Sequence, residues 1–269
     1  MIIFFAAIVI ILLILSQLID YAKVKLMFHP SKIHQSAGSF PIPPLDIRIN
    51  NDNETIHGWF FQQSTKYPTI LISHGNAGNI SDRRELINTL LQLKCNVFIY
   101  DYQGYGESTG SPSELNCYAD GESAYNYLTE TLYLPDDQII LLGESIGCGV
   151  ASYLAQKKHN RKLILLSGFS SIKDMFESLL PIQLTFFKFL GIFLKEFPVN
   201  KYLSSYKGQT LILHSQVDEI VPYDHALTNS RVNPKSCKLI NISGPHNAPF
   251  FSDFCLNEIN SFINGGNPP

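Results

Sequence analysis

The order of apolar and polar positions along the chain predicts strands that alternate with helices. Short runs that are apolar nearly throughout are separated by amphipathic stretches, which is typical of a mostly parallel sheet covered by helices on both faces. The predicted strands are 46–49, 55–61, 69–73, 96–100, 138–142, 163–166, 210–213 and 238–242. The first predicted helix begins after Ser81, which is its predicted N-cap. The other predicted helices are 114–132, 150–155, 223–231 and 252–263. Asn51-Asp52-Asn53 predicts an antiparallel hairpin between the first two strands.

An uncharged apolar segment at the N-terminus stands apart from this alternation. Residues 2–19 contain only Ser16 and Gln17 as polar residues. A helix over this stretch would be roughly 27 Å long, close to the hydrocarbon thickness of a bilayer. A cleaved signal peptide would need a basic start and a small-x-small cleavage site, and a buried core helix would need a polar edge. We therefore expect a retained transmembrane anchor over residues 1–20.

Basic residues after this segment predict its orientation. Lys23, Lys25 and Lys32 follow it and nothing basic precedes it, so the positive-inside rule favours a cytoplasmic location for the rest of the chain. Tripeptides of the glycosylation type would favour the opposite side, although such tripeptides are common by chance. They begin at Asn53, Asn79 and Asn241.

The remaining chain divides into a linker and one folded domain. Residues 21–44 contain Pro and Ser and are predicted to be a linker, and residues 45–269 are predicted to form the domain, with a cap at about 169–206. Between Pro181 and Phe197 the cap is apolar nearly all round, so this helix must be buried or face lipid. Two interpretations remain open: ordinary packing on the sheet, or an acyl-chain pocket or membrane-facing lid.

Composition narrows the function classes. The chain has 269 residues, 45% of them hydrophobic, and a net charge of −3, which implies no general attraction to nucleic acid. Its five cysteines are scattered and contain no C-x-x-C pair, which argues against a disulfide framework and a zinc site. We expect no metal, no organic cofactor and no nucleic-acid partner.

The sequence Gly143-Glu144-Ser145-Ile146-Gly147 lies between an apolar strand and a helix-like run. A strand, G-x-S-x-G and a helix together are the context of a nucleophile elbow, in which the serine hydroxyl is exposed on a strained turn. The glycines are needed because a Cβ would crowd that turn. Ser145 is therefore the candidate nucleophile. A Gly-rich turn without chemistry is the alternative for this pattern taken alone.

Two further residues complete a candidate catalytic triad. Asp218 follows a predicted strand, comes after Ser145 and precedes His246, which follows the last strand. In a triad the carboxylate orients the histidine, and the histidine takes the serine proton and later returns it to the leaving group. Glu219 and Asp224 are the competing carboxylates.

The loop after the strand 69–73 is the candidate oxyanion loop. It reads His74-Gly75-Asn76-Ala77-Gly78-Asn79. In this arrangement one oxyanion donor is the N–H after the nucleophile, here Ile146, and the other comes from this loop, here the N–H of Asn76. His74 itself is expected to brace the loop.

These motifs follow one another in the order found in the α/β-hydrolase-fold serine hydrolases, which the chain therefore resembles. The resemblance is closest to the membrane-anchored "α/β hydrolase domain-containing" group. The resemblance covers about residues 28–262. It implies an α/β-hydrolase fold and hydrolysis of esters or thioesters of acyl chains, as in lysophospholipases, monoacylglycerol lipases and depalmitoylases. Three positions depart from the family pattern and put the substrate in doubt: Cys148 and Ser215, where glycine is usual, and Gly168, where proline is usual.

The sequence thus predicts a single-pass membrane serine hydrolase whose catalytic domain lies on the cytoplasmic side. The expected partners are the membrane and a small molecule, lipid or protein that carries an acyl chain. Two alternatives stay open. One is a membrane-tethered interaction module that keeps the fold without turnover. The other is a serine peptidase of the same fold, which would usually need a larger cap.

Overall fold

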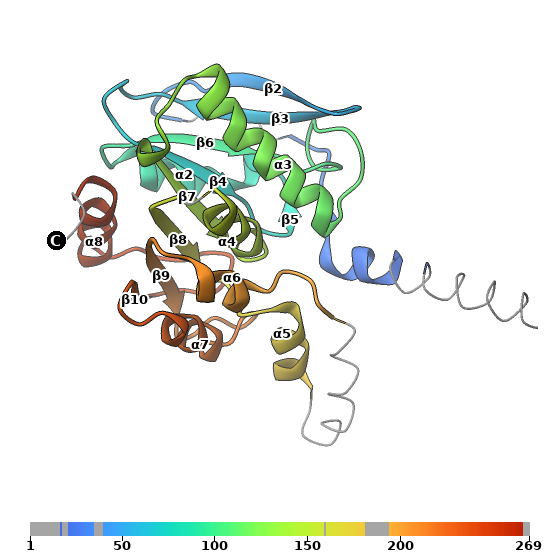
Figure 1. The fold of residues 1–269 in the computed structure, drawn as a ribbon, viewed down its shortest axis with the longest axis vertical. Coiled ribbons are helices and arrows are strands. Elements are labelled where there is room, and N and C mark those ends of the chain that lie inside the picture. The colour runs from blue at the N-terminus through green and yellow to red at the C-terminus, as the bar shows by residue number, and fades with distance from the viewer. Residues whose placement is uncertain (1–16, 18–20, 35–39, 159, 181–193, 266–269) are drawn as a thin grey trace, which may run out of the picture.

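A computed structural model describes residues 17, 21–34, 40–158, 160–180 and 194–265, and an eight-stranded sheet runs through this part of the chain (Figure 1). The spatial order is β10-β9-β8-β7-β4-β6-β3-β2. All neighbours are parallel except the pairs β2/β3 and β3/β6, which confirms the mostly parallel sheet and the hairpin. The strands are β2 (Leu45–Asn51), β3 (Glu54–Phe61), β4 (Thr69–Ser73), β6 (Asn96–Tyr100), β7 (Ile139–Glu144), β8 (Lys162–Leu166), β9 (Gln209–Ser215) and β10 (Cys237–Ile242).

Helices cover both faces of the sheet. Buried residues of α3, α4, α6 and α7 pack on one face, and those of α2 and α8 pack on the other. Figure 1 shows α3 and α4 in front of the strands. The α-helices are α2 (Arg84–Leu91), α3 (Glu114–Asn126), α4 (Gly147–Lys157), α5 (Ile172–Leu179), α6 (Val199–Ser205), α7 (Asp224–Val232) and α8 (Asp253–Asn264). Shorter turns are η1 (Ile80–Arg83), η2 (Tyr127–Thr131), which continues α3, and η3 (Asp136–Gln138).

The first of these helical segments begins earlier than the sequence suggested. The prediction that Ser81 is the N-cap was wrong, because Asn79 caps η1 instead. The Asn79 side chain accepts a hydrogen bond from the Ser81 N–H at 2.9 Å, and Asp82 accepts one from the Asn79 N–H at 2.9 Å. Such a reciprocal pair satisfies two helix-terminal donors at once.

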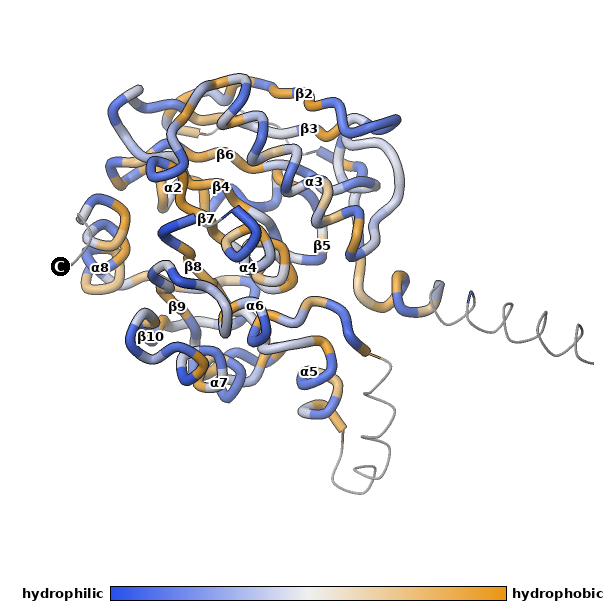
Figure 2. Tube along the Cα trace, in the orientation of Figure 1, coloured by the Kyte–Doolittle hydropathy of each residue, from blue (hydrophilic) through white to orange (hydrophobic). Residues whose placement is uncertain are grey.

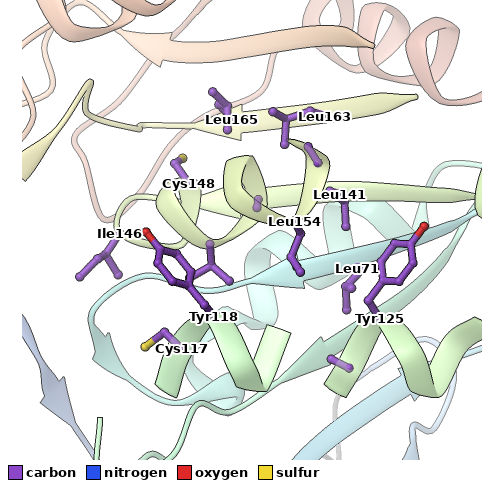
Figure 3. Packing of buried hydrophobic residues seen from close by; sticks show 14 of the residues in the cluster. Leu71, Cys117, Tyr118, Tyr125, Leu141, Ile146, Cys148, Leu154, Leu163 and Leu165 are labelled. Atoms are coloured by element: carbon purple, nitrogen blue, oxygen red, sulfur yellow. The ribbon is translucent and has the colours of Figure 1, made fainter. Parts of the chain in front are cut away.

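Alternation along the central strands builds two hydrophobic cores. In β7, Ile139 and Leu141 face the core beneath α3 and α4, whereas Ile140 and Leu142 face the core beneath α2 and α8. Figure 2 shows hydrophobic residues gathered along the inner strands, and Figure 3 shows part of the first core. Burying one such side chain contributes roughly 1.5–3 kcal/mol, so the sheet is held firmly from both sides.

The parallel strands bring distant loops to one edge. The carboxyl ends of β4, β7 and β9 point the same way as that of β10, because these strands are parallel. The loops after them carry Asn76, Ser145, Asp218 and His246, in that order. In open α/β sheets ligands bind at this edge.

Two predicted segments fall largely outside the described residues. These are the transmembrane anchor, residues 1–20, and the centre of the cap, residues 181–193. Among the helices that the structure describes, none combines the length and apolar character needed to cross a membrane. The predicted linker contains secondary structure that was not predicted from the sequence. Residues 21–27 are helical, and β1 (His29–Pro30) pairs with β5 (Ala77–Gly78) in a small parallel sheet.

Candidate active site

Ser145 sits on a strained turn between β7 and α4. Its φ is +53°, a value that is uncommon outside glycine, and its N–H donates to the Leu166 carbonyl at 2.9 Å. A Cβ at Gly147 would lie 1.9 Å from the Ser73 carbonyl oxygen, and one at Gly143 would lie 2.5 Å from the Cys148 Cα. Neither glycine can therefore be replaced without moving backbone, as the elbow interpretation requires.

The structure brings Ser145, His246 and Asp218 into one hydrogen-bonded chain. His246 Nε2 lies 3.0 Å from Ser145 Oγ, and His246 Nδ1 lies 2.8 Å from Asp218 Oδ2. Since a carboxylate can only accept, Nδ1 carries the proton and Nε2 presents its lone pair to the serine hydroxyl. This arrangement can draw a proton from Ser145 as its oxygen attacks.

The Asp218 carboxylate is held in its charged form. Its side chain is fully buried, and this burial opposes ionisation, but the hydrogen bond from His246 and those from two backbone N–H groups outweigh it. The pKa of Asp218 is therefore lowered. Those N–H groups belong to Ile220 and Val221 and lie 3.0 and 2.8 Å from Oδ1.

The two competing carboxylates have other positions. Glu219 accepts the backbone N–H of His246 at 3.0 Å, so it holds the loop rather than the ring. Asp224 is exposed in the first turn of α7. Neither carboxylate has a hydrogen bond to the His246 ring among the described residues.

The two predicted oxyanion donors line the same cavity as Ser145. No hydrogen bond between described residues uses the N–H of Asn76 or that of Ile146, so both remain available. The carbonyl of Asn76 is held on its other side, by the His29 N–H at 2.9 Å and the Tyr105 hydroxyl at 2.7 Å. Fixed donors of this kind are what stabilises a developing oxyanion.

A largely covered ion pair, which the sequence analysis missed, supports the oxyanion loop. Glu144 accepts the Gly75 N–H at 2.9 Å and the Arg83 Nε–H at 2.5 Å. Burial is the largest single influence and raises the pKa of Glu144, but the charge of the Arg83 guanidinium and the Gly75 N–H together outweigh it, so the net shift is downward. The sequence did contain a signal for this ion pair: Glu144 is a charged residue at the end of the apolar strand β7, and a charged residue that is taken out of water needs a partner of opposite charge.

Asp101, directly after β6, is surrounded by histidines. Its Oδ1 accepts the Ile80 N–H at 2.9 Å, and its Oδ2 lies 3.3 Å from His34 Nε2 and 3.7 Å from His57 Nδ1. Among the described residues, His34, His57 and Asp101 are the group whose atoms are close enough to hold a metal ion. Burial opposes the charge of Asp101, but the contacts with its neighbours, led by the hydrogen bond with His34, outweigh it and lower its pKa.

His74 has the bracing position expected of it. Its Nδ1–H donates to the Gly75 carbonyl at 2.7 Å, and its ring is completely buried. Burial lowers the pKa of His74 to about 4, so the ring is neutral near pH 7. It fixes the start of the oxyanion loop.

Two departures from the family pattern compensate each other. Cys148 is fully buried in α4 (Figure 3). Its thiol donates to the Gly143 carbonyl at 3.1 Å. A Cβ at Gly168 would come within 2.5 Å of the Cys148 sulfur. The larger residue at 148 therefore fits because the residue at 168 is small. Burial raises the pKa of the thiol, which keeps it inert.

A second serine–histidine contact lies deeper in the molecule, and the sequence analysis did not anticipate it. Ser170 Oγ lies 3.0 Å from His225 Nδ1, and the same hydroxyl donates to Asp174 Oδ2 at 2.6 Å. Both Ser170 and His225 are buried. This contact joins the start of the cap to α7.

A mostly apolar cavity of about 530 Å³ opens onto Ser145 and His246. Its volume lies within the usual range for small-molecule sites, roughly 300–1,000 Å³. Apolar side chains come from three parts of the chain: the helical residues 21–27, α5, and the loop before α7. They include Leu26, Met27, Ile172, Met175, Phe176, Leu179, Ile220 and Val221.

Comparison with known proteins gives consistent matches. Residues 68–197 match the sequence profile of the alpha/beta hydrolase fold family. The chain is 32% identical to the alpha/beta hydrolase domain-containing protein WAV2 of Arabidopsis thaliana over 209 residues, which cover 70% of this chain and 68% of that protein. It is 33% identical to protein bem46 of Schizosaccharomyces pombe over 223 residues, which cover 75% of this chain and 72% of that protein.

Solved structures agree on the fold. The esterase Pf2001 of Pyrococcus furiosus superposes with a TM-score of 0.65 at 17% identity, covering 81% of this chain and 90% of the esterase. At this level of identity the likeness establishes a shared architecture and nothing finer.

Proposed function

The chain belongs to the alpha/beta hydrolase fold family, and on this premise we propose that it is a serine hydrolase of carboxylic esters or thioesters. The observation that carries the proposal is the hydrogen-bonded chain from Ser145 through His246 to Asp218. It supplies a nucleophile, a base with its lone pair on the nucleophile, and a buried carboxylate that fixes the base.

Acylation comes first. Ser145 Oγ attacks the acyl carbonyl carbon while its proton passes to His246 Nε2. The resulting oxyanion is held by the N–H groups of Asn76 and Ile146, and Asp218 stabilises the imidazolium. The tetrahedral intermediate then collapses. The bond to the leaving oxygen or sulfur breaks, His246 protonates that leaving group, and the acyl chain remains on Ser145.

Deacylation repeats these steps with water. His246 takes a proton from a water molecule, whose oxygen attacks the acyl carbonyl carbon of the acyl-enzyme. Collapse of the second intermediate breaks the bond to Ser145 Oγ, and His246 returns the proton to the serine. The products are a carboxylic acid and, from the first step, an alcohol or a thiol.

The substrate class follows from the cavity and from the N-terminal sequence. The side chains that line the cavity around Ser145 are mostly apolar, which suits an acyl chain rather than a charged group. Residues 2–19 have the length and composition of a membrane span, and the lysines after them favour the cytoplasmic side for the catalytic domain. We therefore propose a membrane-anchored enzyme acting on lipid-like or acylated substrates.

Labelling with a fluorophosphonate tests this proposal, because the reagent modifies activated serines. Membranes that carry the wild type should show a labelled band, and the Ser145→Ala variant should show none. Turnover of a fluorogenic ester should disappear with the label. A folded wild type that remains unlabelled and hydrolyses no ester would contradict the proposal and favour an interaction module without turnover.

A further inference from the structure

The chain that follows the predicted anchor forms one wall of the catalytic cavity. We call residues 21–31 the wall segment. Leu26 and Met27 of this segment line the cavity together with Ser145. The next residue, Phe28, is buried, and its ring packs edge-on against Phe197 with centroids 6.3 Å apart. The segment is therefore built into the domain and is not a free tether.

Backbone hydrogen bonds join the wall segment to the oxyanion loop. The His29 N–H donates to the Asn76 carbonyl at 2.9 Å, and the Ser31 N–H donates to the Gly78 carbonyl at 3.0 Å. These bonds belong to the β1/β5 pair, which no feature of the sequence predicted. The position of the wall segment is thus tied to a proposed oxyanion donor, Asn76.

An ion pair holds the other end of the wall segment to the cap. Lys23 Nζ lies 2.7 Å from Glu196 Oε1, and both side chains are about four-fifths covered. Partial burial weakens the screening by water, so this contact is stronger than an exposed pair. The wall segment is fixed at both ends, and its central residues face the cavity.

Exposed apolar side chains surround the mouth of this cavity. Leu26 is 79% exposed, Leu179 of α5 is 61% exposed and Ile220 is 40% exposed, and all three contribute to the cavity lining. They come from three separate stretches of the chain. A convergent group of exposed apolar residues at a cavity is typical of an interaction surface.

The chain itself indicates what covers this surface. The uncharged apolar residues 2–19 end one residue before the wall segment, with Asp20 between them, so a bilayer that held them would lie next to this segment. Tyr21 is 64% exposed, and Lys25 Nζ lies 5.8 Å from the centroid of its ring. Tyrosine and lysine are the residues that gather at membrane interfaces, with their polar ends among the headgroups.

We propose that the wall segment seats the mouth of the catalytic cavity on the bilayer surface, so that the acyl chain of a membrane-embedded substrate enters the cavity directly from the leaflet. Leu26, Leu179 and Ile220 then contact the acyl-chain region of the membrane, and Lys25 lies at the headgroups. This inference rests on the proposed function. It adds the source of the substrate and makes the wall segment part of the substrate site.

The test compares two esters on the full-length protein in phosphatidylcholine vesicles. One is a fluorogenic palmitoyl ester embedded in the bilayer, and the other is a water-soluble fluorogenic octanoyl ester, whose chain is long enough to occupy the apolar cavity. Leu26→Glu and Leu179→Glu are made separately. Both acyl chains meet any charge inside the cavity, but only the palmitoyl ester must be drawn from the bilayer, so kcat/KM for the palmitoyl ester should fall at least about tenfold more than kcat/KM for the octanoyl ester.

Leu45→Glu is the matched control. Leu45 is 55% exposed, begins the edge strand β2 and does not line the cavity, so the ratio of the two activities should stay at its wild-type value. Fluorophosphonate labelling in detergent checks that each variant is folded. Since Leu26 and Leu179 lie on separate elements, either variant alone carries the test if the other does not accumulate.

The outcomes separate this inference from its premise. A labelled wild type whose two activities fall equally in the variants, or do not fall at all, would overturn docking on the bilayer and leave the serine hydrolase intact. A folded wild type that is not labelled and hydrolyses neither ester would overturn the serine hydrolase, and the source of its substrate with it.

Discussion

Two serine–histidine pairs in this chain have the same separation, but we expect one to be catalytic and the other to be structural. Ser145 Oγ lies 3.0 Å from a nitrogen of His246, and Ser170 Oγ lies 3.0 Å from a nitrogen of His225. The first pair opens onto the cavity. The second is buried between the start of the cap and α7.

The pairs differ in where the carboxylate stands. Asp218 contacts the far nitrogen of His246, so the near nitrogen is free to accept the Ser145 proton. Asp174 contacts the Ser170 hydroxyl itself, so that proton already points to a carboxylate and not to His225. A carboxylate behind the histidine makes a base, whereas a carboxylate on the serine makes a structural hydrogen bond.

Backbone geometry adds a second difference. Ser145 is held at positive φ on a turn that two glycines make possible, and two unused backbone N–H groups line the cavity beside it. Ser170 has a covered hydroxyl and lines no part of that cavity. The comparison shows that distance between a serine and a histidine is a poor guide to catalysis without the orientation of the proton.

The largest effect is expected from exchanging each serine for alanine. Ser145→Ala should lower kcat for a fluorogenic butyryl ester by about 10⁴-fold or more, because nothing else supplies a nucleophile. Ser170→Ala should stay within about threefold of the wild type. Initial rates of the two purified variants measure both effects. A large loss in Ser170→Ala, with the fold preserved, would break the distinction between the pairs.

The carboxylates should give the next largest effect. Asp218→Asn keeps the shape of the site but favours the wrong tautomer of His246, so kcat should fall by about 10³- to 10⁴-fold. Asp174→Asn, the matched change at the other pair, should alter kcat by less than about threefold. Steady-state kinetics at pH 7.5 provide the measurement. Similar losses in both variants would show that the position of the carboxylate does not decide catalysis.

Acid should weaken the fold through buried histidines outside the triad. Burial lowers the pKa of His225, and it lowers the pKa of His74 to about 4. Well above pH 6.5 these rings are neutral in both the folded and the unfolded state. As the pH falls from about 6.5 towards 4, these histidines bind protons in the unfolded chain but not in the folded chain, so the free energy of unfolding decreases. His74 alone accounts for a loss on the order of 3 kcal/mol.

Chemical unfolding at pH 7 and at pH 4.5 checks this expectation. His74→Asn and His225→Asn should each reduce the difference in the free energy of unfolding between the two pH values, even if the variants are less stable than the wild type at pH 7. If neither variant changes the slope, the acid sensitivity has another origin, and the buried histidines are not the groups that resist protonation.

The smallest expected effect concerns stability at neutral pH. Ser170→Ala removes the 2.6 Å hydrogen bond to Asp174 in a covered site and should lower the free energy of unfolding by about 1–2 kcal/mol. Ser145→Ala should change it by less than about 1 kcal/mol, since Ser145 is only partly buried. Urea denaturation at pH 7 measures both values. The reverse order would contradict the structural assignment of Ser170.

Much of this site could be predicted because its parts are local patterns at strand ends. The elbow around Ser145 is a contiguous motif, and Asp218 and His246 each follow a strand whose apolar run is easily recognised. Parallel strands then bring the three loops to one edge without further information. The central strands were predicted for the same reason, since burial on both faces leaves a continuous apolar signal.

The remainder depends on side-chain packing between distant positions. Ser170 and His225 are 55 residues apart, and nothing local in either segment indicates that Asp174 will take the serine proton. The pairing of β1 with β5 is likewise too short to leave a periodic pattern. The start of η1 was missed because Asn79 and Ser81 both suit an N-cap, and the choice depends on where Asp82 can reach.

Mapping the residue that a fluorophosphonate modifies tests the central claim most directly. The full-length wild type is labelled in membranes, digested, and analysed by mass spectrometry for phosphonylated peptides. The account predicts modification at Ser145 and an unmodified Ser170 in the same sample. Modification at Ser170, or a folded protein in which Ser145 stays unmodified, would contradict it.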